Sequence, residues 1–486
     1  MRHPILYEIN ARCWLAELSE RVGHRLTLGD VPDEEFDFWQ RCGFTHIWLM
    51  GVWSLGRRGL AHSKRAFEGR EEEIGKCELA GSTFAIVGYD VSRKLGGASA
   101  LATFRRKLNE RGIKLLLDFI PNHTALDHPW VKEHSDFYVT SDSPRDGAVK
   151  PFRGATRWFA HGDSGHGAPW IDTLQLDFRN PDVRRAVIAD LRRVAEQCDG
   201  VRCDMAMLVL NEVFARTWKD FPTTHLAIEA EFWSDAISAV REQRPDFLFL
   251  AEVYWELEAC LQQLGFDFTY DKPLYDHLIS RGASEVTQYL HTLTPSFLAR
   301  SIHFIENHDE PRIASLLSLA EHKAAALLVL ALPGMRFLHE GQMTGRRIHA
   351  SVHLATRRAE VEDAGIKVFY DWLLTALPQT AVGSGEWSLL QPQIAWEQNS
   401  THLHIALVQW QKAPRTFDLA VVNLSAVQSQ CYAPLSIANL SQSNWRLADF
   451  LGHEVHERDG TALGTRGLYL DLAPHAAQLF HFEPIP

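Results

Sequence analysis

Short apolar segments that recur eight times along the chain, each separated from the next by longer helical patterns, constrain the fold more than any other feature. The apolar segments have the length and composition of buried β-strands, and apolar residues recur at helical spacing between them. Strands that alternate with helices favour a parallel sheet, and eight such units favour a closed (β/α)8 TIM barrel. The predicted strands are residues 5–10, 45–50, 114–119, 200–205, 247–252, 266–271, 301–306 and 335–340.

Two segments interrupt this alternation. The first follows the third strand, is rich in Gly, Pro, Asp and His, and is too long for an ordinary barrel loop. In the second, near the C-terminus, the helical pattern gives way to alternating or apolar runs separated by turn residues. We therefore predict a barrel of residues 1–123 and 173–382, a small inserted domain of residues 124–172, and an antiparallel β-sandwich of residues 383–486.

Composition excludes several classes of protein. The 486 residues include 49 Lys and Arg against 61 Asp and Glu, a net charge of -12, which argues against a nucleic-acid partner because phosphate binding needs clustered cations. The longest apolar run, residues 324–333, is far shorter than the roughly 20 residues that span a bilayer, so no membrane partner is expected. The seven Cys have no metal-ligand spacing, and the first residues lack the apolar run of a signal peptide. These features predict a cytoplasmic protein, and they leave its oligomeric state open.

Polar residues gather where four predicted strands end, the position of the active site in barrel enzymes. Arg202 lies two positions before Asp204 on the same face of its strand, so it is placed to pair with that carboxylate and keep it ionised. Glu252 ends an apolar strand, an environment that raises a carboxyl pKa and suits a proton donor. The same rim receives the segments 118–124 and 306–312.

Carboxylates, two His and one Arg at one rim suit cleavage of a glycosidic bond, in which one carboxylate attacks and a second delivers a proton. Any one of these residues alone would more often be a salt-bridge or capping residue. Four groups on four strands of one predicted barrel favour a catalytic interpretation.

The four segments resemble, in order and spacing, the signature regions of the α-amylase family of retaining glycoside hydrolases. The matching segments are DFIPNHT (118–124), GVRCDMAM (200–207), LAEVYW (250–255) and FIENHDEPR (304–312), and GFTHIWLMGVW (43–53) is similar to the family's second strand.

The resemblance implies a role for each matching residue. Asp204 would be the nucleophile, Glu252 the general acid and then base, and Asp309 the carboxylate that stabilises the transition state. The implied substrate-binding residues are Arg202, which orients Asp204, His123 and His308 at the cleaved sugar, Asp118 as the structural acid of the first region, and Tyr89 as the aromatic platform. Retaining geometry requires about 5 Å between the Asp204 and Glu252 carboxylates.

The sequence also departs from the family. Many members carry Lys-His three and four residues after the nucleophile, where this chain has Met207 and Leu208. That His provides a carbonyl for a structural calcium ion, so no cofactor is expected to be required. Calcium is kept as the weaker expectation, with Asn122 and Asp177 as weak candidate ligands. In many members that Lys binds the acceptor side of the glucan. Its replacement by Met207 therefore also favours short oligosaccharides or transfer over ordinary cleavage of long starch.

Aromatic and basic residues near the rim give softer signals. Trp255 is the best candidate for stacking on a sugar beyond the residues above, ahead of Tyr254 and the aromatic residues of the insert, Trp158, Phe159 and Trp170. Arg346 and Arg347 are interpreted first as members of a salt-bridged loop and second as a site for an anionic group on a substrate or effector.

The predicted function is hydrolysis of α-glucosidic bonds in α-glucans or malto-oligosaccharides by double displacement, with an α-glucoside as the partner. A transglycosylase or a trehalose-type isomerase would use the same residues, and a phosphorylase is a further alternative on this scaffold. A non-catalytic barrel that only binds a partner is disfavoured, because Asp204, Glu252 and Asp309 are all present.

Overall fold

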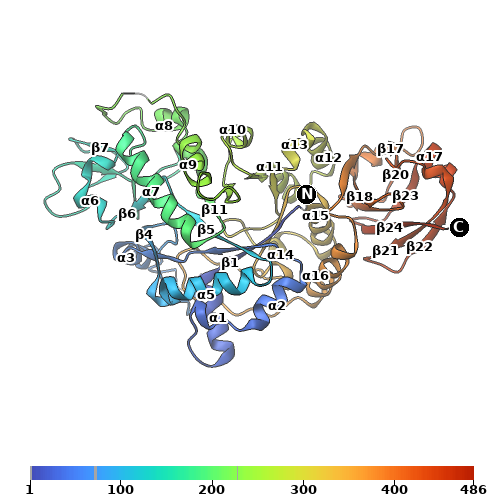
Figure 1. Ribbon diagram of the computed structural model, residues 1–486, viewed down its shortest axis with the longest axis horizontal. Coiled ribbons are helices and arrows are strands. Elements are labelled where there is room, and N and C mark those ends of the chain that lie inside the picture. Colours follow the sequence, from blue (N-terminus) through green and yellow to red (C-terminus); the bar gives the residue numbers. More distant parts are fainter. Residues whose placement is uncertain (1–2, 71–73, 227, 486) are drawn as a thin grey trace.

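A closed barrel of eight parallel strands forms the body of the molecule (Figure 1). The computed structural model describes residues 3–70, 74–226 and 228–485. The strands follow one another around the barrel in the order β1, β15, β14, β13, β12, β11, β5 and β2, which confirms the predicted fold class. Their bounds are β1 Ile5–Asn10, β2 His46–Met50, β5 Lys114–Phe119, β11 Gly200–Cys203, β12 Leu248–Ala251, β13 Phe268–Tyr270, β14 Ser301–His303 and β15 Met335–His339.

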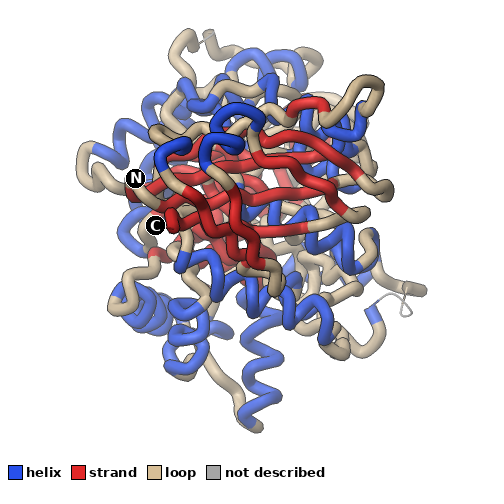
Figure 2. The backbone as a smooth tube through the Cα atoms, turned by 90° about the vertical axis from the view of Figure 1, so that its right-hand side faces the viewer, coloured by secondary structure: helices blue, strands red, loops and turns tan. Residues whose placement is uncertain are grey.

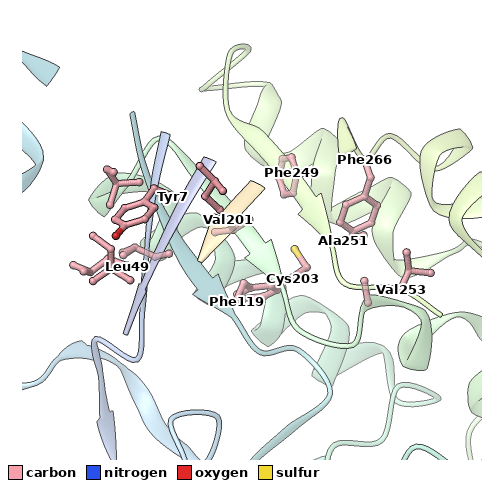
Figure 3. Close-up of a cluster of buried hydrophobic side chains, with 14 of the residues drawn as sticks. Tyr7, Leu49, Phe119, Val201, Cys203, Phe249, Ala251, Val253 and Phe266 are labelled. Carbon is pink, nitrogen blue, oxygen red and sulfur yellow. The ribbon is translucent and has the colours of Figure 1, made fainter. Parts of the chain in front are cut away.

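On β1, β2, β5, β12 and β15, residues that point to opposite faces of the strand belong to two different buried clusters. One cluster fills the barrel and includes Leu6, Trp48, Leu116, Leu250 and Phe337. The other packs the outer barrel face against the helices, and Figure 3 shows part of it, with Tyr7, Leu49, Phe119, Val201, Cys203, Phe249 and Ala251. Because side chains alternate with a period of two, a residue two positions after an inward apolar residue also points inward.

Helices cover the outside of the barrel between successive strands. Local sequence sets several of their ends: Asn180 caps α7 by accepting a hydrogen bond from the backbone N–H of Asp182, and a proline follows at the first helical position. The longer helices are α1 Ala11–Val22, α2 Asp33–Arg41, α3 Arg57–Ala66, α5 Gly97–Asn109, α7 Pro181–Gln197, α9 Phe232–Arg241, α11 Lys272–Ile279, α12 Ala283–Thr292, α15 Leu319–Ala331 and α16 Ala364–Ala376.

Two excursions leave the strand–helix alternation. An antiparallel pair of β3 (Trp53–Leu55) and β4 (Ile86–Val91), a long hairpin with α3 in its connection, follows the second barrel strand and was not predicted from the sequence. The second excursion follows β5: β6 (His123–Ala125) pairs antiparallel with β10 (Thr173–Gln175). Between these two strands lies a small sheet of β7 (Thr140–Ser141), β9 (Trp158–Ala160) and β8 (Ala148–Val149). The insert therefore leaves and re-enters the barrel through one short ladder.

Two antiparallel sheets form the C-terminal region, at the right of Figure 1 and facing the viewer in Figure 2. One face of the larger sheet packs on the smaller sheet, and its other face packs on α15, a helix buried on nearly every side. The larger sheet contains β16 Glu386–Leu390, β18 Ile405–Ala413, β19 Thr416–Asn423, β24 Ala477–Ile485, β21 Asn444–Asp449 and β22 Val455–Arg458. The smaller contains β17 Gln393–Ile394, β20 Ser429–Ala433 and β23 Leu468–Leu472. This confirms the predicted antiparallel C-terminal sheets.

All seven cysteines are free thiols, and Cys13, Cys198, Cys203 and Cys431 are buried. In the described part of the chain, no helix has both the length and the apolar character needed to cross a membrane.

Candidate active site

The polar residues that follow β11, β12 and β14 meet at the carboxyl end of the barrel. Arg202 and Asp204 continue the inward face of β11, and Glu252 lies two residues after the inward Leu250 of β12. His308 and Asp309 belong to the loop that follows β14. All but Asp309 are buried, whereas the Asp309 side chain is 45% exposed. The barrel thus collects charged groups from three strands at one rim.

One guanidinium joins two of the carboxylates. Arg202 Nη1 lies 2.7 Å from Asp204 Oδ1, and Arg202 Nη2 lies 2.7 Å from Glu252 Oε2. Neighbouring nitrogen atoms of one planar group hold both carboxylates side by side, an arrangement compatible with the short separation that a retaining pair requires.

Aromatic rings enclose this guanidinium. The rings of Trp48, Phe84 and Tyr270 lie with their centroids 5.1, 5.2 and 5.9 Å from the Arg202 Cζ atom. A cation over aromatic faces and between two carboxylates stays charged and fixed, so Arg202 serves as the rigid anchor of the site.

The environment of Glu252 keeps part of its population protonated at neutral pH. Burial raises the pKa of Glu252 to about 7, with Arg202 opposing and Asp204 and Asp309 adding to the rise. The carboxylate also accepts hydrogen bonds from the Met205 N–H at 2.7 Å and the Tyr254 hydroxyl at 2.9 Å. A carboxyl group poised near neutrality is suited to both giving and taking a proton.

Asp309 is kept ionised by its neighbour. Desolvation works against its charge, but His308 outweighs that effect and lowers the pKa of Asp309 to about 2. His308 Nε2 lies 3.1 Å from Asp309 Oδ2, and His308 Nδ1 lies 2.5 Å from Glu8 Oε1. Burial lowers the pKa of His308, yet Asp309 and Glu8 together raise it well above its ordinary value.

Asp118 lies beneath the rim. Its Oδ1 accepts from the Trp48 indole at 3.0 Å and its Oδ2 from the Gly51 N–H at 3.1 Å. Burial raises the pKa of Asp118 to about 6. Both oxygen atoms are thereby committed to the second strand and its loop, so Asp118 supports Trp48, whose ring packs on Arg202.

The structure places a different aromatic residue at the rim from the one predicted. The Tyr89 hydroxyl is hydrogen-bonded to the N–H and the carbonyl of Ile120, and its ring stacks on Phe119. Phe84 instead lies against both Arg202 and His308, with 5.4 Å between the Phe84 and His308 ring centroids. An aromatic residue five positions before Tyr89 was visible in the sequence, but the unpredicted hairpin decides which ring reaches the site.

His123 reaches the site from the root of the insert. It is buried at the start of β6, its ring contacts Trp170 with centroids 5.2 Å apart, and burial lowers its pKa. The charge of Asp204 acts in the opposite direction on that pKa. A neutral imidazole at this position can donate one hydrogen bond and accept another.

Comparison with known proteins identifies the family. Residues 34–371 match the family model described as alpha amylase, catalytic domain. The chain belongs to the α-amylase family. The match covers all three carboxylates, Arg202 and both His.

Relatives of this α-amylase family member are distant in sequence. The chain is 22% identical over 368 residues to Alpha-amylase 3 of Dictyoglomus thermophilum, covering 71% of this chain and 64% of the relative. It is 21% identical over 404 residues to Maltase 1 of Drosophila virilis, covering 71% and 58%. The chain thus spans less than two thirds of the length of these two relatives.

Solved structures share the whole fold. The maltogenic α-amylase AmyB of Thermotoga neapolitana superposes with a TM-score of 0.70 at 17% identity, with 99% of each chain covered. The α-amylase of Geobacillus thermoleovorans, solved with acarbose, gives 0.68 at 18% identity, with the same coverage. The arrangement of barrel, insert and C-terminal sheets is therefore that of these enzymes.

The softer candidates lie at the edge of the site or are engaged elsewhere. Trp255 is 36% exposed, has a positive φ of 64°, and contacts His166 of the insert with ring centroids 4.6 Å apart. Arg346 forms a two-pronged ion pair with Glu17, 2.9 Å at each nitrogen atom, and Arg347 lies 3.5 Å from Asp363. These contacts fit the interpretation of a salt-bridged loop.

The residues proposed for calcium do not fit a metal ion. Gln175 Nε2 donates to the backbone and side-chain oxygen atoms of Asn122, each at 2.9 Å, and Asn122 Nδ2 donates back to Gln175 Oε1 at 3.1 Å. Asp177 is paired through both oxygen atoms with Arg179, at 2.7 and 2.8 Å. The oxygen atoms that calcium would need therefore already accept hydrogen bonds from protein donors.

Met207 and Leu208, which replace the family's Lys-His pair, are buried in a short 3-10 helix, residues 206–209. Both side chains belong to the large buried apolar cluster outside the barrel interior. Charged contacts to an acceptor sugar are therefore missing at these two positions.

Proposed function

We propose that this protein cleaves α-glucosidic bonds of α-glucans or malto-oligosaccharides with retention of anomeric configuration. The observation that carries the proposal is the bridge from Arg202 to both Asp204 and Glu252 at the carboxyl rim of the barrel. It puts Asp204 against a guanidinium cation and next to Glu252, whose pKa is raised to about 7 as a proton donor in double displacement requires.

In the first step, Asp204 attacks the anomeric carbon while Glu252 gives its proton to the departing glycosidic oxygen. A covalent glucosyl–enzyme ester results, and the remainder of the substrate leaves as an alcohol. Glu252 is then ionised, still held by Arg202 and by the Met205 N–H, and these contacts stabilise the charge it has gained.

In the second step, Glu252 takes a proton from a water molecule, which attacks the anomeric carbon and releases Asp204. Two displacements on the same carbon restore the original configuration. Asp309 stays ionised throughout beside His308, where it supplies negative charge to an oxocarbenium-like transition state and accepts hydrogen bonds from sugar hydroxyls.

The sugar subsite is proposed to use Phe84 as its apolar face. Its ring is half-buried and lies beside Arg202 and His308, where a sugar bound to Asp204 would stack. His123 and His308 are placed to contact sugar hydroxyls from two sides, and Trp255 is proposed to contact the substrate from the rim.

A product panel tests the function. The purified protein is incubated with malto-oligosaccharides, isomaltose, trehalose and sucrose, with and without phosphate, and the anomeric form of the first product is followed by proton NMR. We expect α-configured products from at least one α-glucoside, and none from Asp204→Asn. Products of inverted configuration would refute double displacement. Equal inactivity of the wild type and Asp204→Asn on every substrate would refute the proposal that the protein is a glycosidase.

The same panel shows whether water or a sugar hydroxyl attacks the covalent intermediate. Longer or isomerised glucosides would identify a transglycosylase or isomerase, for which the chain has the same catalytic residues. Similarity to the α-1,4-glucan:maltose-1-phosphate maltosyltransferase of Chlorobaculum tepidum, 27% identical over 272 residues covering 54% of this chain and 34% of that one, makes transfer the alternative to examine first.

Two secondary proposals accompany the function. No calcium ion is required, a proposal supported by the hydrogen bonds between Gln175 and Asn122. A reducing, cytoplasmic setting is supported by the seven free thiols.

A further inference from the structure

A further carboxylate, Glu8, lies inside the barrel below Asp204, Glu252 and Asp309. Glu8 follows the inward Leu6 on β1 and is fully buried. Its Oε1 lies 2.5 Å from His308 Nδ1, a contact between residues 300 positions apart in the sequence. Because a buried carboxylate is costly unless it is paired, Glu8 needs a charged or strongly polar partner, and His308 is in contact with it.

Carboxylates flank both nitrogen atoms of His308. Glu8 faces Nδ1, and Asp309 Oδ2 lies 3.1 Å from Nε2. A neutral imidazole has one N–H, whereas an imidazolium has one on each nitrogen atom, so only the cation presents a proton to both carboxylates.

The Nε2 atom of His308 is also the end that faces the site. It is buried, and within the described residues it has no hydrogen bond of acceptable geometry, although Asp309 lies close by. A buried donor left without a hydrogen bond beside the three carboxylates is available to a ligand hydroxyl.

The charged and titratable groups around His308 come from several elements. They are Glu8 on β1, Asp118 on β5, Arg202 on β11, Asp309 on the same loop as His308, His339 on β15, and His349, whose Nε2 lies 2.7 Å from the His308 carbonyl oxygen. Burial and Arg312 lower the pKa of His339 well below its ordinary value. That ring is therefore neutral, and its Nε2 lies 3.9 Å from Glu8 Oε2, so His308 is the cation that pairs with Glu8.

Aromatic packing fixes the plane of the His308 ring. Trp48 meets it edge-on and Phe84 lies over it at 33°, each with its centroid 5.4 Å away. Rotation of the imidazole is thereby restricted, and the hydrogen bond to Glu8 determines which nitrogen atom points outward.

We propose that Glu8 is a positioning residue: it holds His308 as an imidazolium with Nε2–H directed at Asp309 and at the sugar hydroxyls bound there. Its effect on catalysis rests on the proposed function, whereas the charge state of His308 does not. Glu8 touches no reacting atom and acts only through His308.

The charge state is tested first, in the wild-type protein. Histidine ¹⁵N NMR spectra are recorded from pH 5 to pH 9, and the His308 resonances are assigned by their loss in His308→Gln. We expect both ring nitrogens of His308 to remain protonated through pH 7.5. A neutral His308 at pH 7 would overturn the proposal whether or not any substrate is turned over.

The role of Glu8 is tested with Glu8→Gln, which keeps the shape and removes the charge. The ratio of variant to wild-type kcat/KM cancels the ionisation of Glu252 that both proteins share. We expect this ratio to fall about tenfold or more between pH 5.5 and pH 8, as the variant loses the His308 proton that the wild type keeps. Glu8→Asp, which restores the charge, is expected to recover part of the loss.

A matched pair elsewhere in the barrel provides the control. Asp271 Oδ2 lies 2.8 Å from His303 Nδ1, both side chains are buried, and neither contacts the three carboxylates within the described residues. Asp271→Asn should lower stability while its kcat/KM ratio to wild type stays flat with pH. A flat ratio for Glu8→Gln as well, or a loss of activity that follows only its loss of stability, would reduce Glu8 to a structural residue.

Discussion

At the scale of single residues, the site gives two carboxylates at the same rim, Glu252 and Asp309, different charge states. Glu252 is surrounded by apolar β12 and by other acids, so its proton is retained up to a pH of about 7. Asp309, next to a protonated His308, is ionised far below that pH. The surroundings of each carboxyl group, and not its residue type, therefore make Glu252 the proton donor and keep Asp309 ionised.

The first prediction concerns the pH dependence of catalysis. Because Glu252 must be protonated to act as an acid, we expect kcat/KM of the wild type to fall as pH rises through about 7. In Glu252→Gln, glycosides with poor leaving groups should lose at least about 10²-fold in the first step. With α-glucosyl fluoride, whose leaving group needs no proton, the first step in the variant should remain fast. It should also lose the alkaline limb, which is the fall in rate as pH rises through about 7. An unchanged limb in the variant would assign it to another group.

The second prediction concerns Tyr254. Its hydroxyl donates to Glu252 Oε1 at 2.9 Å, a contact that favours the ionised carboxylate. Tyr254→Phe removes that donor, so the pKa of Glu252 should rise and the alkaline limb of kcat/KM should move to higher pH. Tyr289→Phe removes a similar hydroxyl from Asp271 and should leave the limb where it is. A shift to lower pH in Tyr254→Phe would contradict the assignment.

At the scale of elements, the alternation of barrel strands explains why the site residues converge. Leu6 and Glu8, Leu116 and Asp118, and Leu250 and Glu252 are pairs two residues apart whose first member lies in the inner cluster. The same rule could have identified Glu8 from the sequence, since it follows an inward apolar residue near the end of a strand. Phe84 could not be found in this way, because it precedes β4 in an excursion outside the barrel.

The third prediction concerns the root of the insert, where Gln175 and Asn122 join β10 to the end of β5. EDTA should leave Tm and activity unchanged, since protein donors occupy the oxygen atoms that would bind calcium. Gln175→Glu removes the donor and adds charge, so it should lower stability by about 1–3 kcal/mol and respond to added calcium by a rise in Tm.

The control for this prediction is another buried glutamine. Gln409 forms a similar pair of hydrogen bonds with Ser436 in the C-terminal sheets. Gln409→Glu should be destabilised without any response to calcium. A fall in the Tm of the wild-type protein in EDTA would instead show that Asn122 and its neighbours bind a metal ion.

At the scale of the whole molecule, α15 joins the barrel to the C-terminal sheets. It packs against the barrel on one side and against β18, β19 and β24 on the other. Trp410 of β18 is fully buried, donates its indole N–H to the Ala331 carbonyl at 2.7 Å, and contacts His3 beside β1. The two regions therefore share one apolar layer.

The fourth prediction follows from that layer. Trp410→Ala should cost about 3–5 kcal/mol of unfolding free energy, and the barrel and C-terminal sheets should still unfold in one calorimetric transition. Trp396→Ala, at a side chain that is 52% exposed, should change stability by no more than about 0.5 kcal/mol. Two separate transitions in the wild type would show that the regions are stable independently of each other.

The sequence by itself determined the barrel, the antiparallel C-terminal sheets, and the charged residues at four strand ends. Each of these depends on local periodicity or on adjacent positions, as with Arg202 and Asp204, and such patterns are written in short stretches of chain. Only the tertiary structure decided that Phe84 and not Tyr89 lies beside Arg202, that Gln175 is hydrogen-bonded to Asn122, and that Glu8 contacts His308. Those contacts join segments far apart in the chain, and their geometry depends on barrel closure and hairpin placement, which no local pattern specifies.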